Sequence, residues 1–364
     1  MLDFTSALYL GLRHPSRSLL AWPALTTGKP AALETPASAI GVARQLAALQ
    51  GCERATLLPS TLHLFWDLFG LLADEQVRIY MDEGAYRIAR WGVERAAAQG
   101  VAVRTFPHHD AAAARALIAR DGQGRSRPVI LTDGFCPLCG EPAPITSLLQ
   151  IVERHGGQLV LDDTQAFGVL GEQPCAATPF GCGGGGSLKW HGVSSPHAIV
   201  GSSLAKAFGV PIAVLGGSEA LIRRFEHRSE TRVHCSPPSL AALRAAEHAL
   251  AVDRAQGDRR RLYLSRLVAR FRAQLRDIGL AAHGGLFPVQ IVNPCHRIDA
   301  GTLHLRLLGR GIRTVLLRWC RGIEMRLGFL INALHRPADI DRAIEALDGA
   351  MRLDGVRAVS ARVS

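Results

Sequence analysis

Lysine is scarce in this chain of 364 residues: only three of its 42 lysine and arginine residues are lysine, so 39 are arginine. Long apolar runs are also missing, because no stretch approaches the roughly 18 apolar residues that a membrane-spanning helix needs. The N-terminal segment lacks the basic and apolar regions of a secretory signal. We therefore expect a cytoplasmic protein with no membrane partner.

Cysteine is too thinly spread to suggest a disulfide framework. The chain holds Cys52, Cys136, Cys139, Cys175, Cys182, Cys235, Cys295 and Cys320. This distribution over a long chain predicts reduced thiols. Cys136 and Cys139 form a lone CxxC motif, and no second pair of zinc ligands follows at a suitable spacing, so we predict no metal site.

The composition indicates a folded protein with an excess of positive charge. Apolar residues make up 48% of the chain, which is enough for sizeable cores and excludes a disordered or collagen-like chain. The formal net charge is +11. The arginines are scattered along predicted helices without an aromatic ladder among them, which favours solvated helix faces over a nucleic-acid site. Such a surface would also attract an anionic substrate carrier.

Apolar runs alternate with helical patterns through the first half of the chain. Buried strands are predicted at residues 55–60, 77–82, 101–106, 128–134 and 158–163. Helices are predicted at 37–52, 62–73, 84–98, 110–120 and 143–155. Continuous apolar strands separated by helices indicate an α/β fold whose mostly parallel sheet is covered on both faces. Ligands in such folds bind beyond the carboxyl ends of the strands.

The second half of the chain has a different pattern. From about residue 216 to 278 it is nearly all helical, with one long helix expected from Ser239 through Val252 and resuming toward Leu275. Strands at 289–293, 314–319 and 325–331 with helices at 301–310 and 337–352 predict a small α+β lobe. The five glycines within residues 181–187 predict a flexible surface loop in preference to a phosphate-binding loop.

Lys206 and Asp162 are the strongest candidates for catalytic residues. Both follow apolar strands, and Lys206 lies in a segment of small residues in a chain that otherwise uses arginine. An amine that attacks a carbonyl must lose its proton, which lysine can do and arginine cannot. A lysine and an acid at two strand ends suit pyridoxal phosphate, whose ring nitrogen the acid keeps protonated. A turn-capping Asp162 and a structural Lys206 are the alternatives.

Four segments carry a resemblance to a known family, in order along the chain. They are Ser6–Leu12 (SALYLGL), Leu131–Gly134 (LTDG), Asp162–Gly171 (DDTQAFGVLG) and Ser203–Gly209 (SLAKAFG). The chain thereby resembles the α-oxoamine synthases, which include 8-amino-7-oxononanoate synthase. That family implies a fold-type I pyridoxal phosphate-dependent enzyme with a large cofactor-binding domain, a small α+β C-terminal domain and a homodimeric assembly.

The resemblance also assigns roles to individual residues. Lys206 would form the Schiff base with the cofactor, and Asp162 would partner its pyridine nitrogen. Ser203 stands where the family binds the cofactor phosphate through a hydroxyl group. Thr61 and Leu62 stand where backbone N–H groups bind the same phosphate. Arg318 falls where an arginine takes the carboxylate of the amino-acid substrate.

Two positions depart from the family pattern. Glu83, in the segment Asp82–Ala85 with Tyr86 nearby, stands where the family stacks a histidine on the cofactor ring. Gln165 replaces a second histidine, and it can donate a hydrogen bond to the cofactor but cannot titrate. Both are assigned to cofactor binding. The loss of two histidines bears on the condensation reaction more than on cofactor binding.

We predict a pyridoxal phosphate-dependent transferase that condenses an amino acid with an acyl thioester on CoA or a carrier protein. The alternatives are an aminotransferase or other pyridoxal phosphate chemistry and, more distantly, a non-catalytic binding protein that keeps the fold. The predicted domains are an N-terminal segment (1–36) that joins the small domain, a cofactor-binding domain (37–250), and a linking helix with the small domain (251–364).

Overall fold

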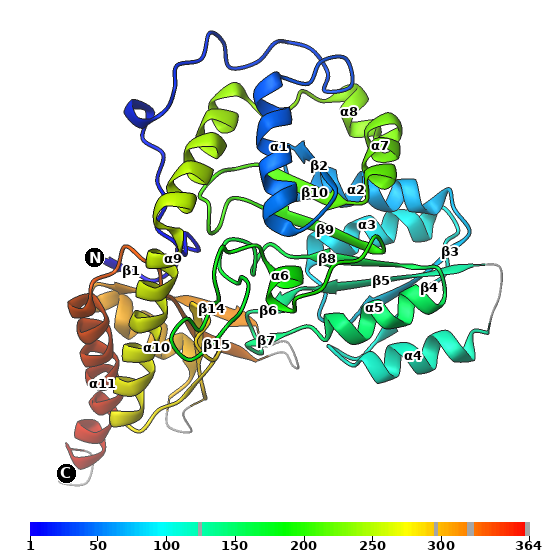
Figure 1. Cartoon of the computed structure of the whole chain (residues 1–364). Coiled ribbons are helices and arrows are strands. Elements are labelled where there is room, and N and C mark those ends of the chain that lie inside the picture. The colour runs from blue at the N-terminus through cyan, green and yellow to red at the C-terminus, as the bar shows by residue number, and fades with distance from the viewer. Residues whose placement is uncertain (123–125, 295–297, 319–323, 361–364) are drawn as a thin grey trace. The chain divides into compact units, whose positions relative to one another are not determined.

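The protein was analysed as a computed structural model, which describes residues 1–122, 126–294, 298–318 and 324–360 (Figure 1). It divides into two compact units. The sheet unit comprises residues 12–136 and 142–258, and the terminal unit comprises 1–11, 137–141 and 259–364. Each unit is described by itself. The three-part division predicted from the sequence stays a prediction.

The sheet unit alternates strands and helices as the sequence predicted. Its strands are β2 (Arg54–Leu58), β3 (Val77–Asp82), β4 (Val103–Phe106), β5 (Arg127–Asp133), β8 (Gln158–Asp162), β9 (Ala198–Ser203) and β10 (Ala213–Gly217). Its helices are η1 (Ser16–Ser18), α1 (Ala37–Gln50), α2 (Thr61–Ala73), α3 (Arg87–Ala98), α4 (Ala111–Arg120), α5 (Ile145–Arg154), α6 (Ser187–Trp190), α7 (Glu219–Arg228) and α8 (Glu230–His234). The short strands β6 (Phe135–Cys136) and β7 (Glu141–Pro142) pair with each other.

The seven strands form one sheet in the order β2-β10-β9-β8-β5-β3-β4. β10 runs antiparallel to both of its neighbours, β2 and β9, and the remaining neighbours are parallel. Because β10 is antiparallel to both, β2 runs in the same direction as β9. The carboxyl ends of all strands except β10 therefore lie at one edge of the sheet.

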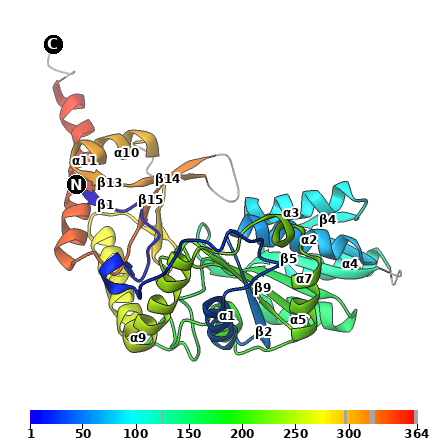
Figure 2. The same cartoon turned by 90° about the horizontal axis from the view of Figure 1, so that it is seen from above.

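Helices cover both faces of the sheet (Figure 2). Ile79, Leu131 and Val160 pack with α2, α3 and α7 on one face. Their neighbours along the strands, such as Ile130 and Leu161, pack with α4, α5 and α6 on the other. Successive strand residues are thus buried on opposite sides, which explains the continuous apolar runs in the sequence. The α/β fold class is confirmed.

Four local predictions were wrong. Helix α3 begins at Arg87 instead of residue 84, because the Asp82 carboxylate accepts the Gly84 N–H (2.7 Å) and holds a turn there. Strand β10 lies where the helical pattern was expected to start near residue 216. The pattern did not reveal this strand because it ends in two glycines, which usually interrupt strands. Gly216 is needed because an added Cβ would lie 2.9 Å from the Cys52 Sγ.

The glycine-rich segment is also different from the flexible surface loop that was predicted. Residues 184–187 are buried. Gly184 accepts a hydrogen bond from the Gly168 N–H, and Gly186 donates one to the Leu170 carbonyl, both at 2.8 Å. A Cβ on Gly185 would lie 2.3 Å from the Leu49 carbonyl oxygen. The glycines therefore allow close backbone packing.

The terminal unit is an α+β assembly built from both ends of the chain. An antiparallel sheet has the order β11-β12-β15-β14, and β1 pairs in parallel with β13. The elements are β1 (Leu2–Asp3), β11 (Ala282–His283), β12 (Val289–Val292), α10 (Ala300–Gly309), β13 (Ile312–Arg313), β14 (Val315–Arg318), β15 (Met325–Leu330) and α11 (Pro337–Ser360).

Helix α9 (Leu240–Asp277) contributes residues to both units and is unbroken. The interruption expected after Val252 is absent, because the residues that follow it are mostly good helix formers and the single Gly257 is tolerated.

Six cysteines, from Cys52 to Cys235, form no disulfide bond in the described part of the chain. Cys295, Cys320 and Trp319 of the predicted strand 314–319 lie outside the described residues. None of the helices within the described ranges is both long and apolar enough to cross a membrane.

Candidate functional site

Polar side chains gather where the parallel strands end. Asp82 ends β3, Asp133 ends β5, Asp162 ends β8 and Ser203 ends β9. Asp133 lies directly opposite Asp162 in the register of β5 and β8. Asp162 in turn lies opposite Gly201, two residues before Ser203. One edge of the sheet thus presents two neighbouring carboxyl groups beside a hydroxyl group.

Lys206 follows β9 in a closed turn at this edge. The turn is held by hydrogen bonds from the Leu204 N–H to the Ile212 carbonyl (2.9 Å) and from the Val210 N–H to the Leu204 carbonyl (3.0 Å). Burial lowers the pKa of the Lys206 ammonium, and the negative charges of Asp162 and Asp133 oppose this without cancelling it. Lys206 is partly buried, and an amine with a lowered pKa can lose its proton and act as a nucleophile.

Asp162 and Asp133 lie opposite each other at the ends of β8 and β5, with Asp162 buried and Asp133 partly buried. Burial raises the pKa of Asp162, against the hydrogen bonds from Thr164, including its N–H at 3.1 Å, and the charge of Lys206. Burial and then the charge of Asp162 raise the pKa of Asp133 well above its ordinary value. Two carboxylates in this position favour a cation between or beside them. The protonated nitrogen of a pyridine ring has the required charge and a single N–H.

The sequence reasoning gave Asp133 no role, although the clue that identified Asp162 was available. Asp133 is also an acid placed directly after an apolar strand. Its Oδ1 accepts the backbone N–H of Tyr86 at 2.9 Å, so it also fixes the start of α3. The Tyr86 side chain is 56% exposed. Tyr86 is therefore an exposed aromatic residue whose backbone N–H is hydrogen-bonded to Asp133.

Backbone N–H groups suited to an anion lie at the start of α2. Ser60 provides no side-chain cap, since its Oγ is bonded to His63 Nδ1 (2.9 Å). Leu64 donates the first helical hydrogen bond, to the Ser60 carbonyl. The N–H groups of Thr61, Leu62 and His63 therefore have no hydrogen bond among the described residues. A helix N-terminus with unpaired N–H groups favours a phosphate.

Ser203 ends β9 at the same edge of the sheet at which β2 leads into α2. Its N–H donates to the Thr164 Oγ1 (3.0 Å), and its Oγ accepts the Ala205 N–H (3.2 Å). The Ser203 Oγ–H is thus available as a donor while its position is fixed by the turn.

The other predicted site residues are placed as follows. Glu83 is exposed, and its Oε1 accepts the His108 N–H at 3.2 Å, so it braces a neighbouring loop. Gln165 is partly buried and follows Thr164. Arg318 is exposed at the end of β14 in the terminal unit, opposite Met325. The roles assigned to these three residues stay predictions.

Asp82 is a further buried acid that the sequence reasoning missed. It accepts hydrogen bonds from His108 Nδ1 (2.8 Å), the His109 N–H (3.0 Å) and Thr132 Oγ1 (3.0 Å). Burial alone would raise the pKa of Asp82, but these hydrogen bonds outweigh it and the pKa is lowered. Asp82 is therefore ionised, and its charge adds to the rise in the pKa of Asp133.

Taken together, these residues fit pyridoxal phosphate. The observations that favour this are the partly buried amine of Lys206, the neighbouring acids Asp162 and Asp133, and the uncapped start of α2. They match the aldehyde, the pyridine nitrogen and the phosphate of the cofactor respectively.

The family model for aminotransferase class I and II matches residues 45–347. The 8-amino-7-oxononanoate synthase of Thioalkalivibrio sulfidiphilus is 33% identical over 256 residues, which are 70% of this chain and 62% of that protein. The corresponding enzyme of Cupriavidus taiwanensis is 32% identical over 257 residues, which are 68% of this chain and 60% of that protein. The chain thus spans about three-fifths of the length of these relatives.

Solved structures resemble the protein over nearly its whole length. Sphingomonas wittichii serine palmitoyltransferase has a TM-score of 0.82 at 16% identity, covering 97% of this chain and 88% of that chain. The 8-amino-7-oxononanoate synthase from Francisella tularensis has a TM-score of 0.74 at 18% identity, covering 97% of this chain and 98% of that one. At these identities the likeness shows the shared fold.

Proposed function

Because this chain belongs to the aminotransferase class I and II family, we propose that it is a pyridoxal phosphate-dependent transferase that condenses an amino acid with an acyl thioester. The observation that carries the proposal is the partly buried Lys206 just after β9, whose pKa is lowered by burial although the charges of Asp162 and Asp133 oppose the shift. A structural lysine would be expected to reach solvent or to pair with one acid. The lowered pKa of Lys206 instead favours the neutral amine, which is the form that reacts with a carbonyl group.

Each part of the site has a separate task toward the cofactor. When bound, pyridoxal phosphate supplies an electron sink that stabilises negative charge on the substrate carbon. Asp162 would keep the pyridine nitrogen protonated, and Asp133 lies opposite Asp162 at the same end of the strands. The N–H groups of Thr61 and Leu62 and the hydroxyl of Ser203 bind the phosphate. Lys206 would hold the cofactor through its amine and, when that amine is free, would give or take a proton at the reacting carbon.

The acyl thioester, on CoA or a carrier protein, is proposed from the names of the curated relatives and the motif resemblance. Arg318 is proposed to bind the substrate carboxylate, and Gln165 and Glu83 to border the cofactor. Transamination is the second candidate, because Gln165 cannot supply the acid–base chemistry of the histidine that the related motif carries. We also propose that the protein is a homodimer and that it is located in the cytoplasm.

The Lys206→Ala variant tests the cofactor chemistry. Purified protein mixed with pyridoxal phosphate should show a visible absorbance band from the lysine–cofactor linkage, and Lys206→Ala should lose it. Lys189→Ala is the matched control, since Lys189 pairs with Glu172 (2.7 Å), away from the acid pair, and should keep the band. A colourless wild-type protein would rule out the proposed cofactor.

The same preparation separates the two reactions. Condensation releases a free CoA thiol from an acyl-CoA in the presence of an amino acid, whereas transamination forms a keto acid without thiol release. Keto acid formation alone would replace the condensation proposal with the aminotransferase.

A further inference from the structure

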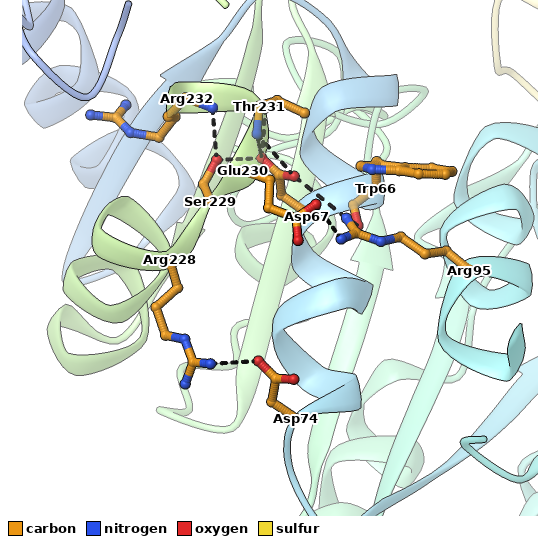
Figure 3. Close-up of polar contacts among 9 residues, drawn as sticks. All are labelled: Trp66, Asp67, Asp74, Arg95, Arg228, Ser229, Glu230, Thr231 and Arg232. Carbon is orange, nitrogen blue, oxygen red and sulfur yellow. Dashed lines mark hydrogen bonds and ion pairs between the residues drawn. The ribbon is translucent and has the colours of Figure 1, made fainter. Parts of the chain in front are cut away.

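Asp67 on α2 is a buried acid that the proposed chemistry does not use. Its side chain is fully shielded from solvent, yet it faces polar groups from two other helices (Figure 3). Its Oδ2 accepts the hydroxyl group of Ser229, the Thr231 Oγ1–H at 2.6 Å and the Thr231 N–H at 3.1 Å. All three donors lie at the start of α8, more than 160 residues away in the sequence.

Arg95 on α3 approaches the same carboxylate from the other side. Its Nη1 lies 3.6 Å from Asp67 Oδ1 and donates to the Trp66 carbonyl at 2.8 Å. Its Nη2 pairs with Glu230 on α8 at 2.5 Å, and its guanidinium lies 4.8 Å from the centre of the Trp66 ring. One arginine thus joins α2, α3 and α8.

Two glycines allow α2 and α3 to come close enough for this arrangement. A Cβ on Gly70 would lie 2.6 Å from the Arg95 guanidinium carbon, so a side chain there would displace Arg95. A Cβ on Gly92 would lie 2.4 Å from the Phe65 carbonyl oxygen. The position of α2 is therefore set by close packing and by a charged hydrogen-bond network at its second turn.

The network also reaches the segment that precedes α1. The Ser229 Oγ accepts the Arg232 N–H at 3.3 Å, and the Arg232 guanidinium donates to the Ala31 carbonyl (3.2 Å) and Thr35 Oγ1 (3.3 Å). Asp67 is consequently the acid at which connections from α3, α8 and the N-terminal segment meet.

The consequence for function follows from the rigidity of a helix. Asp67 lies six residues after Thr61, or about 9 Å along the axis at 1.5 Å per residue. A well-packed helix moves as a unit, so whatever fixes Asp67 also fixes the N–H groups of Thr61 and Leu62. We propose that Asp67 is a positioning residue for the cofactor phosphate: it anchors α2 so that the first turn points its N–H groups at that phosphate. This inference rests on the proposed function.

The test compares pyridoxal phosphate with pyridoxal, which has the same ring and aldehyde but no phosphate. Asp67→Asn keeps the size of the side chain but removes its charge and turns an amide N–H₂ toward donors. We expect it to weaken pyridoxal phosphate binding about tenfold, because small displacements of a binding group are costly. Pyridoxal binding should change less than twofold, as measured by titration of the visible absorbance band.

Asp74→Asn is the matched control. Asp74 follows the same helix and pairs with Arg228 (Figure 3). The pair is 2.6 Å apart, and the Asp74 side chain is 53% exposed. An exposed pair of this kind contributes little, so both affinities should stay at the wild-type value. If Asp67→Asn does not fold, Thr231→Val, which removes one donor and leaves the acid, should show the same phosphate-specific loss to a smaller extent.

The outcomes distinguish this inference from the proposed function. A wild-type protein that binds no pyridoxal phosphate overturns the proposed function. A wild-type protein that binds it, together with variants that bind it equally well or that lose both ligands in parallel, overturns the role of Asp67 alone.

Discussion

Asp163 is a buried acid in the sheet unit whose pKa is raised to about 7. Burial raises its pKa from 3.8 to about 7, against hydrogen bonds from Ser187 and with a further rise from the charge of Asp162. Its carboxylate accepts the Ser187 N–H at 2.9 Å and the Ser187 hydroxyl group. Asp163 therefore fixes the start of α6, next to the acid that is proposed to hold the cofactor.

The pH dependence that follows has a definite sign. Because the folded state holds the Asp163 proton more tightly than the unfolded state, the free energy of unfolding falls as pH rises from about 4 to about 7. The full effect of this one group is about 4 kcal/mol. Asp163→Asn cannot ionise, so its stability should decline less than that of the wild type over this range.

Urea unfolding of the cofactor-free protein at about pH 5 and about pH 8 measures this difference. Ser187→Ala is the informative companion, because removing the Ser187 hydroxyl group raises the pKa of Asp163 further and should steepen the decline. Equal declines in the wild type and Asp163→Asn would contradict the assignment of this titration to Asp163.

At the scale of single elements, the sequence predicted most of the sheet unit. Continuous apolar runs revealed β3, β5 and β8, because burial on both faces leaves little room for polar residues. β10 escaped prediction because Gly216, which is required for packing against Cys52, and Gly217 are residues that usually interrupt a strand. The early start expected for α3 failed for a similar reason: the Asp82 side chain stabilises a turn that the helical pattern does not reveal.

The candidate site could be predicted only where a residue type at a strand end carries the information. Lys206 and Asp162 were predicted in this way and Ser203 from the family resemblance, and Asp133 also follows an apolar strand. The bond between Asp82 and His108 joins residues 26 apart, and the one between Asp67 and Thr231 joins residues 164 apart. Such pairs depend on sheet order and helix packing, which no local pattern specifies.

The turn that carries Lys206 is connected to two other segments through a histidine pair. His14 Nε2 lies 2.7 Å from the Phe208 carbonyl oxygen, and His14 Nδ1 lies 3.0 Å from His248 Nδ1. A carbonyl oxygen only accepts, so His14 donates through Nε2 and, when neutral, accepts through Nδ1 from His248. The pair therefore ties the Lys206 turn to the N-terminal segment and to α9.

His14→Phe should loosen this turn. Losing the hydrogen bond to Phe208 is expected to speed amide hydrogen exchange of residues 204–210 about fivefold at neutral pH, which corresponds to about 1 kcal/mol. Burial is the main cause that lowers the pKa of His14, with a further decrease from the charge of His248. Its contribution to stability is therefore present above about pH 6.5 and is lost as pH falls below that value.

His155→Phe is the control for this experiment, because His155 is exposed after α5. Its exchange rates over residues 204–210 should match those of the wild type. If His14→Phe also leaves these rates unchanged, the histidine pair does not hold the turn.

At the scale of the whole molecule, the charge of +11 is the property that the fold does not explain. Many arginines form surface ion pairs, such as Arg223 with Glu219 and Arg270 with Asp341, and pairs of this kind contribute little to stability. Arginine and lysine together exceed the acids by 11, so the chain has a net positive charge. This net charge produces a long-range electric field. This field acts on the approach of charged substrates.

The proposed acyl-CoA substrate carries several phosphate charges, whereas the amino acid is close to neutral. We therefore expect kcat/KM for acyl-CoA to fall about tenfold between about 0.02 M and about 0.3 M KCl, because salt screens the attraction that speeds encounter. The value of kcat at saturation should change little, and kcat/KM for the amino acid serves as the internal control. A decline of equal size for both substrates would mean that salt acts on the enzyme itself, and no decline for either would mean that the arginine excess does not steer the thioester.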